Sequence, residues 1–505
     1  MNADTHRPPA RLRGVAAAAA LLAACTVGPN FVRPTAKVPD HWSPQAAAAS
    51  KAGPSGPAAK QPAKSPPTKS LRGAPLGGWW RGFGDPQLDA LIARALRSNL
   101  DLRAALLRIE EARALGGIAA AGGLPALSVD AAFSRQRMSE TTATGALFNS
   151  IGRTHLPGVS GVGIANPYNQ LQLSGDASWE IDLFGRVRRA VEAANAGVQV
   201  SLEDRRAVMV AVLADVAQNY VDLRGAQARD QIAKDNLATI GELVELTRMR
   251  RAAGLTTQID VSQAQSQAAA TRAELPAFEL QITQAINALS RLLGLAPEAL
   301  RGELLQAAAV PAAPPVPIGV PADLARRRPD IREAEAALHA ATAQIGVSVA
   351  NLFPRLSLSA SGGFQSETGG SLLQWASRFA TIGPTLELPV FDRGRWLAVR
   401  LYKVRAQEAA LAYQRTVLNG LHEVENALSA YAADRQRRAW LGAAVTQDRE
   451  ALALSRQRYR SGLANFVEVL VALRTLQRDE LSQADGATAV SVDSIGVYRA
   501  LGGGW

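Results

Sequence analysis

One long structural pattern occurs twice along this chain of 505 residues. In each copy an alternating segment passes through a Phe- and Arg-containing junction into a long helical stretch, which a Gly-Leu pair then interrupts. Phe184 and Phe391 mark the junctions and Gly254 and Gly462 mark the interruptions, at offsets of 207 and 208 residues. A repeat of this length indicates one supersecondary unit used twice. We therefore predict an internally duplicated chain; the alternative is chance similarity in an Ala-rich sequence.

The duplication sets the expected domain plan. The first repeat spans 81–300 and the second spans 323–505, with a Pro-rich linker at 301–322 between them. Ahead of the repeats we expect a signal peptide at 1–24 and an N-terminal extension with a linker at 25–80.

The N-terminus has the features of a lipoprotein signal. A basic start precedes the apolar run 15–22, which is too short to span a bilayer. Small residues then lead to Cys25, and this arrangement resembles a bacterial lipobox. The resemblance implies a diacylglycerol and an acyl chain, such as palmitate, on Cys25 and sorting to the outer membrane. Cys25 is the only cysteine, so neither a disulfide framework nor a thiol metal site is expected. The alternative is an ordinary signal peptide with a chance cysteine.

Four segments alternate apolar and polar residues with period two, which predicts strands. The first two form a strand pair within about 124–183, and the others are expected at 355–364 and 382–391. Each has the length of a tilted membrane-crossing strand, apolar toward lipid and polar toward a lumen. A soluble sheet with one wet face shows the same alternation.

Very long helical stretches follow each strand pair. The outgoing stretches of about 68 residues contain no proline and would span about 100 Å as helix, longer than any globular core needs. Gly254 and Gly462 are expected to end them as C-terminal caps, after which shorter helices return as antiparallel partners. Pro276 should bend the first return helix. The expected helices are 186–253, 256–292, 394–461 and 464–499.

The strand count excludes a membrane-spanning monomer. Four strands cannot close, because the smallest membrane barrels have about eight strands. Open strand edges in lipid leave unpaired backbone groups that cost several kcal/mol each. Chains must therefore pool their strands. Two chains would give a filled interior of about eight strands and three a wider one of about twelve, and geometry alone does not choose between them.

Several short motifs make the resemblance specific. The chain is similar to the outer-membrane factor (TolC-like) family and most similar to its NodT-type efflux lipoproteins. That resemblance implies a mainly α fold with a small membrane β part: four strands per protomer of a 12-stranded trimeric barrel, plus antiparallel coiled helices forming a periplasmic α-barrel. The motifs are the stretch from Cys25 to Pro34, Trp79-Trp80, Asp85-Pro86-Gln87-Leu88, the stretch from Arg326 to Ile331, and Asn351-Leu352-Phe353-Pro354.

The resemblance also implies function and partners. It implies a homotrimer in the outer membrane of a Gram-negative bacterium, extending into the periplasm. There it would be a passive exit duct of a tripartite multidrug efflux system, opened by a periplasmic membrane-fusion adaptor and an inner-membrane RND-type transporter. A type I protein secretion duct and a non-pore structural periplasmic lipoprotein are the alternatives.

No catalytic or metal site is expected. The five histidines occur singly, without a partner at ligand spacing. The formal net charge of +11 is spread along helices among Asp and Glu, so we expect no nucleic-acid partner. An enzyme is not expected, and neither is a cofactor apart from the lipid on Cys25.

The family pattern places an aperture at the helix tips. Carboxylates just past the second tip line it; Glu468 matches the first such position, whereas Val471 occupies the second. One acidic ring is therefore implied. Gly254-Leu255 and Gly462-Leu463 would present the tips to the adaptor.

The same pattern implies a tether that holds the aperture closed. Asp260 and Tyr459 match two of its members. The third member, an arginine, is replaced by Ala464, and Arg458 or Arg460 would have to substitute for it. The alternative for Glu468 and Asp260 is an ordinary solvated carboxylate on a helix.

Overall fold

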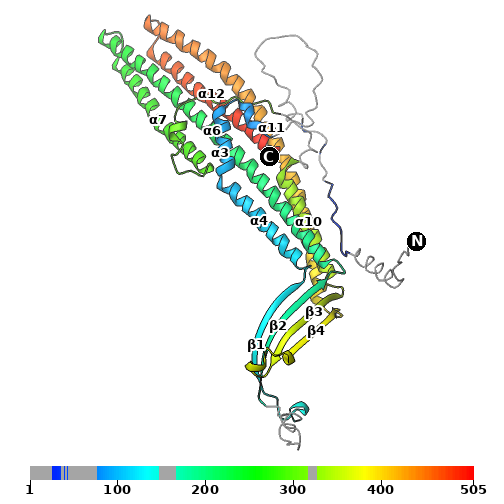
Figure 1. Ribbon diagram of the computed structural model, residues 1–505. Helices are drawn as coiled ribbons and strands as arrows, with labels where there is room; N and C mark the ends of the chain where they lie inside the picture. The colour runs from blue at the N-terminus through cyan, green and yellow to red at the C-terminus, as the bar shows by residue number, and fades with distance from the viewer. Residues whose placement is uncertain are drawn as a thin grey trace, which may run out of the picture. The chain divides into compact units, whose positions relative to one another are not determined.

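The computed structural model describes residues 26–35, 39, 42–43, 77–146, 166–316 and 327–504. The expected signal peptide and Cys25 lie outside the described residues. The described chain is mainly helical with one four-stranded sheet, which confirms the predicted fold class (Figure 1).

The chain divides into two compact units, and each unit draws on both copies of the repeat. The strand unit contains Met1–Val32, Glu111–Val198 and Ala337–Ala409. The helix unit contains Arg33–Glu110, Gln199–Ala336 and Ala410–Trp505. The two units therefore do not coincide with the two repeats, because the long outgoing helix of each repeat begins in the strand unit and ends in the helix unit.

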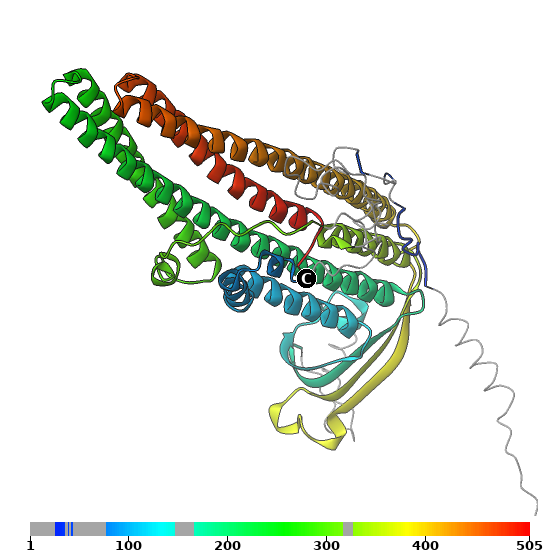
Figure 2. The same cartoon turned by 90° about the horizontal axis from the view of Figure 1, so that it is seen from above.

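The strand unit holds one antiparallel sheet in the order β1-β2-β3-β4. The second strand of the first copy pairs with the first strand of the second copy, so the copies are joined by the β2–β3 ladder. Within the described chain, β1 and β4 are paired on one side only. The sheet is strongly curved (Figure 2). The strands are β1 Ala126–Gln136, β2 Tyr168–Ile181, β3 Arg355–Ser366 and β4 Arg378–Glu387.

The fourth strand differs from its expected range of 382–391. It begins four residues earlier and ends at Glu387, so Leu388 and Val390 lie beyond it. Pro389 explains the early end, because it cannot donate a backbone hydrogen bond to a continuing ladder.

Four helices make up the two long hairpins. Figure 2 shows the pairs running side by side, α6 with α7 and α11 with α12. The first return helix continues through Pro276 without interruption. Shorter helices lead into the sheet in each copy: α3 Pro86–Ser98 and α4 Leu100–Ala121 precede β1, and α10 Pro329–Ala350 precedes β3. The hairpin helices are α6 Arg186–Ala252, α7 Gln258–Leu292, α11 Arg393–Arg460 and α12 Phe466–Ala500.

An N-terminal turn and α3 pack into the largest apolar core of the helix unit. Trp79 stacks on Tyr498 with ring centroids 5.1 Å apart. Asp85 caps α3 by accepting hydrogen bonds from two backbone N–H groups, and it also accepts one from the Tyr220 hydroxyl at 2.7 Å. Burial raises the pKa of Tyr220 and of Tyr498 to about 12. Among the described residues, no helix is both long and apolar enough to cross a membrane.

Candidate functional site

The first hairpin turns by a glycine cap. Gly254 has φ +70°, a conformation that side chains with a Cβ rarely adopt. Its N–H donates to Arg251 O at 2.9 Å, and the N–H of Leu255 donates to Arg250 O at 2.8 Å. This pair of bonds is the Schellman motif, which satisfies the last carbonyl groups of α6.

The second hairpin turns in the same way. Gly462 has φ +75°, and Leu463 N–H donates to Arg458 O at 2.9 Å. Leu463 is 71% exposed and Leu255 is 65% exposed. Both tips thus display a largely exposed apolar side chain.

The two tips contact each other through an arginine that sequence reasoning missed. Arg250 Nη1 donates to the carbonyl oxygens of Tyr459 and Arg460, at 2.9 and 3.1 Å. Its guanidinium also lies 4.7 Å from the centre of the Tyr459 ring. A cation at a helix C-terminus is favourable, and so is a cation over an aromatic face. Arg250 therefore binds the end of α11. The sequence does offer one sign of this role: Arg250 occupies the position in the first copy of the repeat that Arg458 occupies in the second, 208 residues later.

Tyr459 is buried, but its hydroxyl group is not satisfied by the described residues. The ring packs beside Phe466, with centroids 5.6 Å apart, and is 3% exposed. No described residue bonds its Oη. Asp260, its expected partner, instead accepts a hydrogen bond from the hydroxyl of Thr256. The described chain therefore does not join Asp260 to Tyr459, and the tether stays a prediction.

Three further residues of the second tip lie at the start of α12 or at the end of α11. Asn465 caps α12 by accepting a bond from the Glu468 N–H at 3.0 Å. Glu468 is exposed in the first turn, where a negative charge is favourable. Arg458 Nη2 donates to Leu463 O at 3.4 Å, within its own tip.

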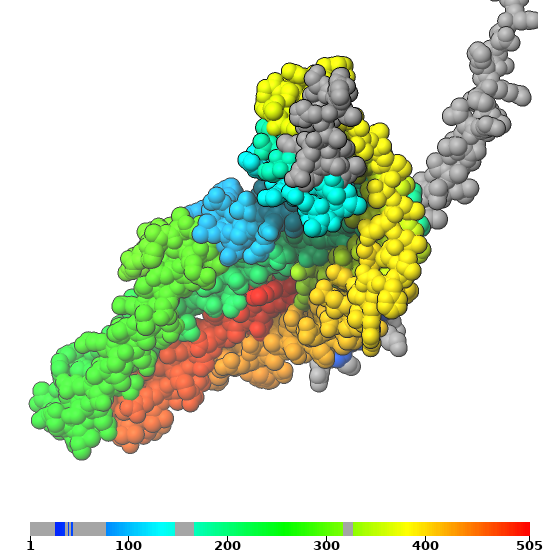
Figure 3. All heavy atoms as spheres, turned by 90° about the horizontal axis from the view of Figure 1, so that it is seen from below, coloured from blue at the N-terminus to red at the C-terminus, as the bar shows by residue number. Residues whose placement is uncertain are grey.

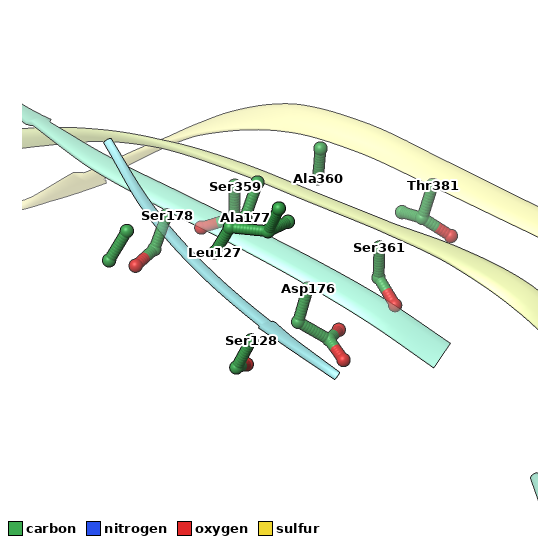
Figure 4. A pocket seen from close by; sticks show the side chains of 10 residues that line it. Leu127, Ser128, Asp176, Ala177, Ser178, Ser359, Ala360, Ser361 and Thr381 are labelled. Atoms are coloured by element: carbon green, nitrogen blue, oxygen red, sulfur yellow. The ribbon is translucent and has the colours of Figure 1, made fainter. Parts of the chain in front are cut away.

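A second feature is the polar face of the sheet. Figure 4 shows Asp176 on β2 among Ser128 of β1, Ser361 of β3 and Thr381 of β4. The opposite face is apolar and exposed, as the alternation predicted. Its side chains include Leu127, Val129, Phe133, Ile382 and Leu386, all at least 64% exposed.

A charged network closes the end of the sheet that meets the helices. Glu180 binds Arg186 through two bonds of 2.7 and 2.8 Å and Arg355 at 2.6 Å. Arg395 binds Glu387 at 3.0 Å in the second copy. Both copies thus place an arginine of the outgoing helix on a glutamate of the preceding strand.

The segment after Cys25 is a strap held by a buried arginine. Val27 N–H donates to Phe184 O at 3.2 Å. Arg189, 3% exposed, donates to the carbonyl oxygens of Val27 and Gly28 at 3.2 and 3.3 Å and to Asn30 Oδ1 at 2.7 Å. The strap thus begins at the junction between the sheet and α6.

Glycine is required within this strap. Gly28 has φ +91°, and a Cβ there would lie 2.5 Å from the Cα of Gly346 on α10. Sequence reasoning did not predict the strap, because residues 26–35 have no periodicity.

Among the described residues, no group of His, Asp and Glu is arranged to hold a metal ion. His339 makes an ordinary structural contact, with Nε2 2.9 Å from Glu192 Oε1 and its ring stacked on Phe31.

Comparisons with known proteins agree along nearly the whole chain. A family model described as "Outer membrane efflux protein" matches residues 91–295 and 320–503. Outer membrane protein OprJ of Pseudomonas aeruginosa is 34% identical, over 96% of this chain and 94% of its own length. Nodulation protein T of Rhizobium leguminosarum bv. viciae is 31% identical, over 96% and 92%. The solved structure of the outer-membrane channel OprN has a TM-score of 0.81 at 33% identity and covers 95% of this chain and 100% of its own.

Proposed function

The chain belongs to the outer membrane efflux protein family, and we propose that three copies of it form one exit duct for solutes across the outer membrane. It is an outer-membrane efflux channel and not an enzyme. The number of copies, the lipid anchor, the roles of the tip residues and the partner proteins are parts of the proposal.

The open edges of the sheet carry the proposal. β1 and β4 each leave one row of backbone groups unpaired in the described chain, and the apolar face beside them is exposed. In lipid, each unpaired group costs several kcal/mol. Pairing β4 of one copy with β1 of the next removes this cost. The β2–β3 ladder, which joins two copies of the repeat within the chain, supplies the template for that contact.

Three copies suit this sheet better than two. About eight strands leave an interior that side chains fill, whereas about twelve leave room for a passage. On the polar face Asp176 is surrounded by serines and by Thr381, which are short side chains and suit an interior that stays open. Cross-linking of the purified protein should give a trimer, and planar-bilayer recording should show conductance. A trimer without conductance would favour a purely structural lipoprotein. A dimer would overturn the proposal of three copies.

We further propose that Cys25 carries the lipid. Thr26, the next residue, packs against Gly185 at the junction of sheet and helix. A lipid on the preceding residue would therefore start at the end of the strands, where a leaflet surface lies. Cys25→Ser should abolish incorporation of labelled palmitate, and label persisting on that variant would refute the assignment.

The tips are proposed to meet a periplasmic adaptor that couples the duct to an inner-membrane RND-type transporter. The exposed Leu255 and Leu463 support this role. Replacing both with Asp should abolish cross-linking to the adaptor while leaving the trimer intact. Unchanged cross-linking would show that the adaptor binds elsewhere.

Closure of the aperture is assigned to Asp260 and Tyr459, with Glu468 as its acidic ring. The unsatisfied Tyr459 hydroxyl supports the assignment, because a buried polar atom needs a partner. Asp260→Ala combined with Tyr459→Phe should raise single-channel conductance. An unchanged conductance would refute the tether.

A further inference from the structure

Four aspartates face one another in two pairs along the contact between α11 and α12. The carboxyl group of Asp434 lies beside that of Asp493, and the carboxyl group of Asp448 lies beside that of Asp479. We call them the upper pair and the tip pair. On each helix the two members are 14 residues apart. That spacing is two heptads, so both pairs lie on the same side of the coil, about 21 Å apart.

The pairs lie in the packing seam of the hairpin. Midway between them on each helix are Leu441 and Gly486. A Cβ on Gly486 would lie 3.5 Å from Leu441 Cδ1 and 3.7 Å from the Cα of Arg438. The helices are therefore in close contact between the two pairs. Figure 3 shows α12 lying against α11 along this hairpin.

The first copy of the repeat has no carboxyl groups at these positions. At the offset of 208, the upper pair corresponds to Ala226 and Ala285, and the tip pair corresponds to Ile240 and Thr271. Ala226 and Ile240 are each 1% exposed and belong to the apolar cores. Where the α6–α7 hairpin has an apolar or small-residue seam, the α11–α12 hairpin has acids.

Each pair contains one buried carboxyl oxygen that has no hydrogen-bond partner among the described residues. Asp448 Oδ2 and Asp493 Oδ2 are buried, and no described donor reaches either of them. An ionised oxygen in that position is costly, whereas a protonated one donates to the neighbouring carboxylate. Two carboxyl groups in contact also resist ionising together. Each pair is therefore more stable while one of its two carboxyl groups is protonated.

The nearby cations bind the other member of each pair. Arg437 Nη1 lies 3.9 Å from Asp434 Oδ1, and Arg478 Nε donates to Asp479 Oδ1 at 2.8 Å. Asp493 and Asp448 are thus the members of the two pairs that have no arginine bound to them in the described chain.

Other charged groups around the hairpin are already engaged. Arg449 of α11 binds Glu480 of α12, and Arg229 of α6 binds Asp485 of α12. The segment 306–316, which packs on α12, has no ionisable side chain. Arg435 and Arg438 are the remaining cations of α11 near the upper pair, and Arg435 lies over the Tyr431 ring.

Burial and the facing carboxyl raise the pKa of Asp493 to about 7. The same causes raise the pKa of Asp448, while the bond from Arg478 lowers that of Asp479. For an acid whose pKa is raised by folding, the stabilisation is complete below its ordinary pKa and is lost as pH rises through the folded value. The contact between α11 and α12 at Asp493 should therefore weaken as the pH rises through about 7.

We propose that a shared proton in each pair holds the α11–α12 hairpin together, and that loss of these protons loosens the contact between its two helices along the seam that contains the pairs. The α6–α7 hairpin has no facing carboxyl pair at the equivalent positions, so its helix contact should not follow this titration. A consequence for the aperture, in the form of an easier opening at alkaline pH, rests on the proposed function. The loosening of the helix contact itself does not.

Electron–electron resonance between two spin labels tests this directly in the full-length protein. Leu454→Cys on α11 and Val471→Cys on α12 place labels at exposed positions across the hairpin. Spin-labelled protein diluted with unlabelled protein is measured from pH 5 to 9, and Cys25→Ser in the same background controls for labelling of the natural cysteine. The label distance should lengthen and broaden as the pH rises.

Variants separate the pairs from general charge effects. Asp448→Asn with Asp493→Asn should keep the short distance at every pH. Glu450→Gln, an exposed carboxyl on the same helix, should titrate like the parent. Labels at Met249 and Ile259 on the first hairpin should show no pH dependence. A parent distance that does not change with pH, or a double Asn variant that changes like the parent, would overturn the proposal. The proposal is supported if the label distance changes with pH in the parent and does not change in the double Asn variant. This result would stand even if the protein showed no conductance.

Discussion

Arg189→Ala should release the N-terminal strap. The arginine is 3% exposed and is the donor for two strap carbonyl oxygens and for Asn30 Oδ1. A hydrogen bond from a charged donor contributes about 1.5 to 3 kcal/mol, and the two carbonyl bonds at 3.2 and 3.3 Å belong below that range. Counting about 1 kcal/mol for each of these and about 1.5 for Asn30, the strap loses roughly 3 to 4 kcal/mol.

Hydrogen exchange measures this loss locally. A loss of about 3 kcal/mol corresponds to a rise of roughly a hundredfold in the opening equilibrium. The amide of Val27, which bonds Phe184 O, should therefore exchange at least that much faster in peptides covering residues 26–33. Arg188→Ala is the matched control. Its side chain is 40% exposed and pairs with Asp182, so its removal should cost less than about 1 kcal/mol and leave the strap protected. Equal exchange in Arg189→Ala and the parent would refute the clamp.

Three further substitutions test the local packing. Gly28→Ala should also free the strap, because the new Cβ would clash with the Gly346 backbone at positive φ; faster exchange of the same peptides checks it. Asp85→Ala should destabilise the helix unit by about 1 to 2 kcal/mol through loss of the α3 cap, seen as a lower denaturation midpoint. Gly225→Val should cost at least about 1 to 3 kcal/mol by overpacking against Thr488, and a calorimetric midpoint equal to the parent's would contradict the close approach.

The long helices could be predicted almost to the residue because their signals are local. An unbroken proline-free pattern fixes the extent of α6 and α11, and a Gly-Leu pair fixes each end. Both glycines have the positive φ that such an end requires. The fourth strand ends before its expected limit because Pro389 stops the backbone pairing, although the alternation of apolar residues continues beyond it.

Contacts between distant segments could not be predicted in the same way. The bonds from Arg250 to the end of α11 and from Arg189 to the strap join residues more than 150 positions apart. Neither arginine differs in its local sequence from the many others in the chain. The aspartate pairs were also hidden, since four acids on helices read as a solvated surface until the antiparallel register brings them together.

The β2–β3 ladder has a consequence for how the duct assembles. It joins within one chain the same kind of edges that β4 and β1 present to other copies. In the proposed trimer, six separate half-chains would need five associations governed by concentration. Covalent linkage in pairs makes three of these contacts intramolecular, at an effective concentration of about millimolar, and leaves two. Assembly then depends on a much lower power of protein concentration. Linkage also removes the requirement that all six halves be identical, so a sequence change in one half appears at alternate positions around the ring.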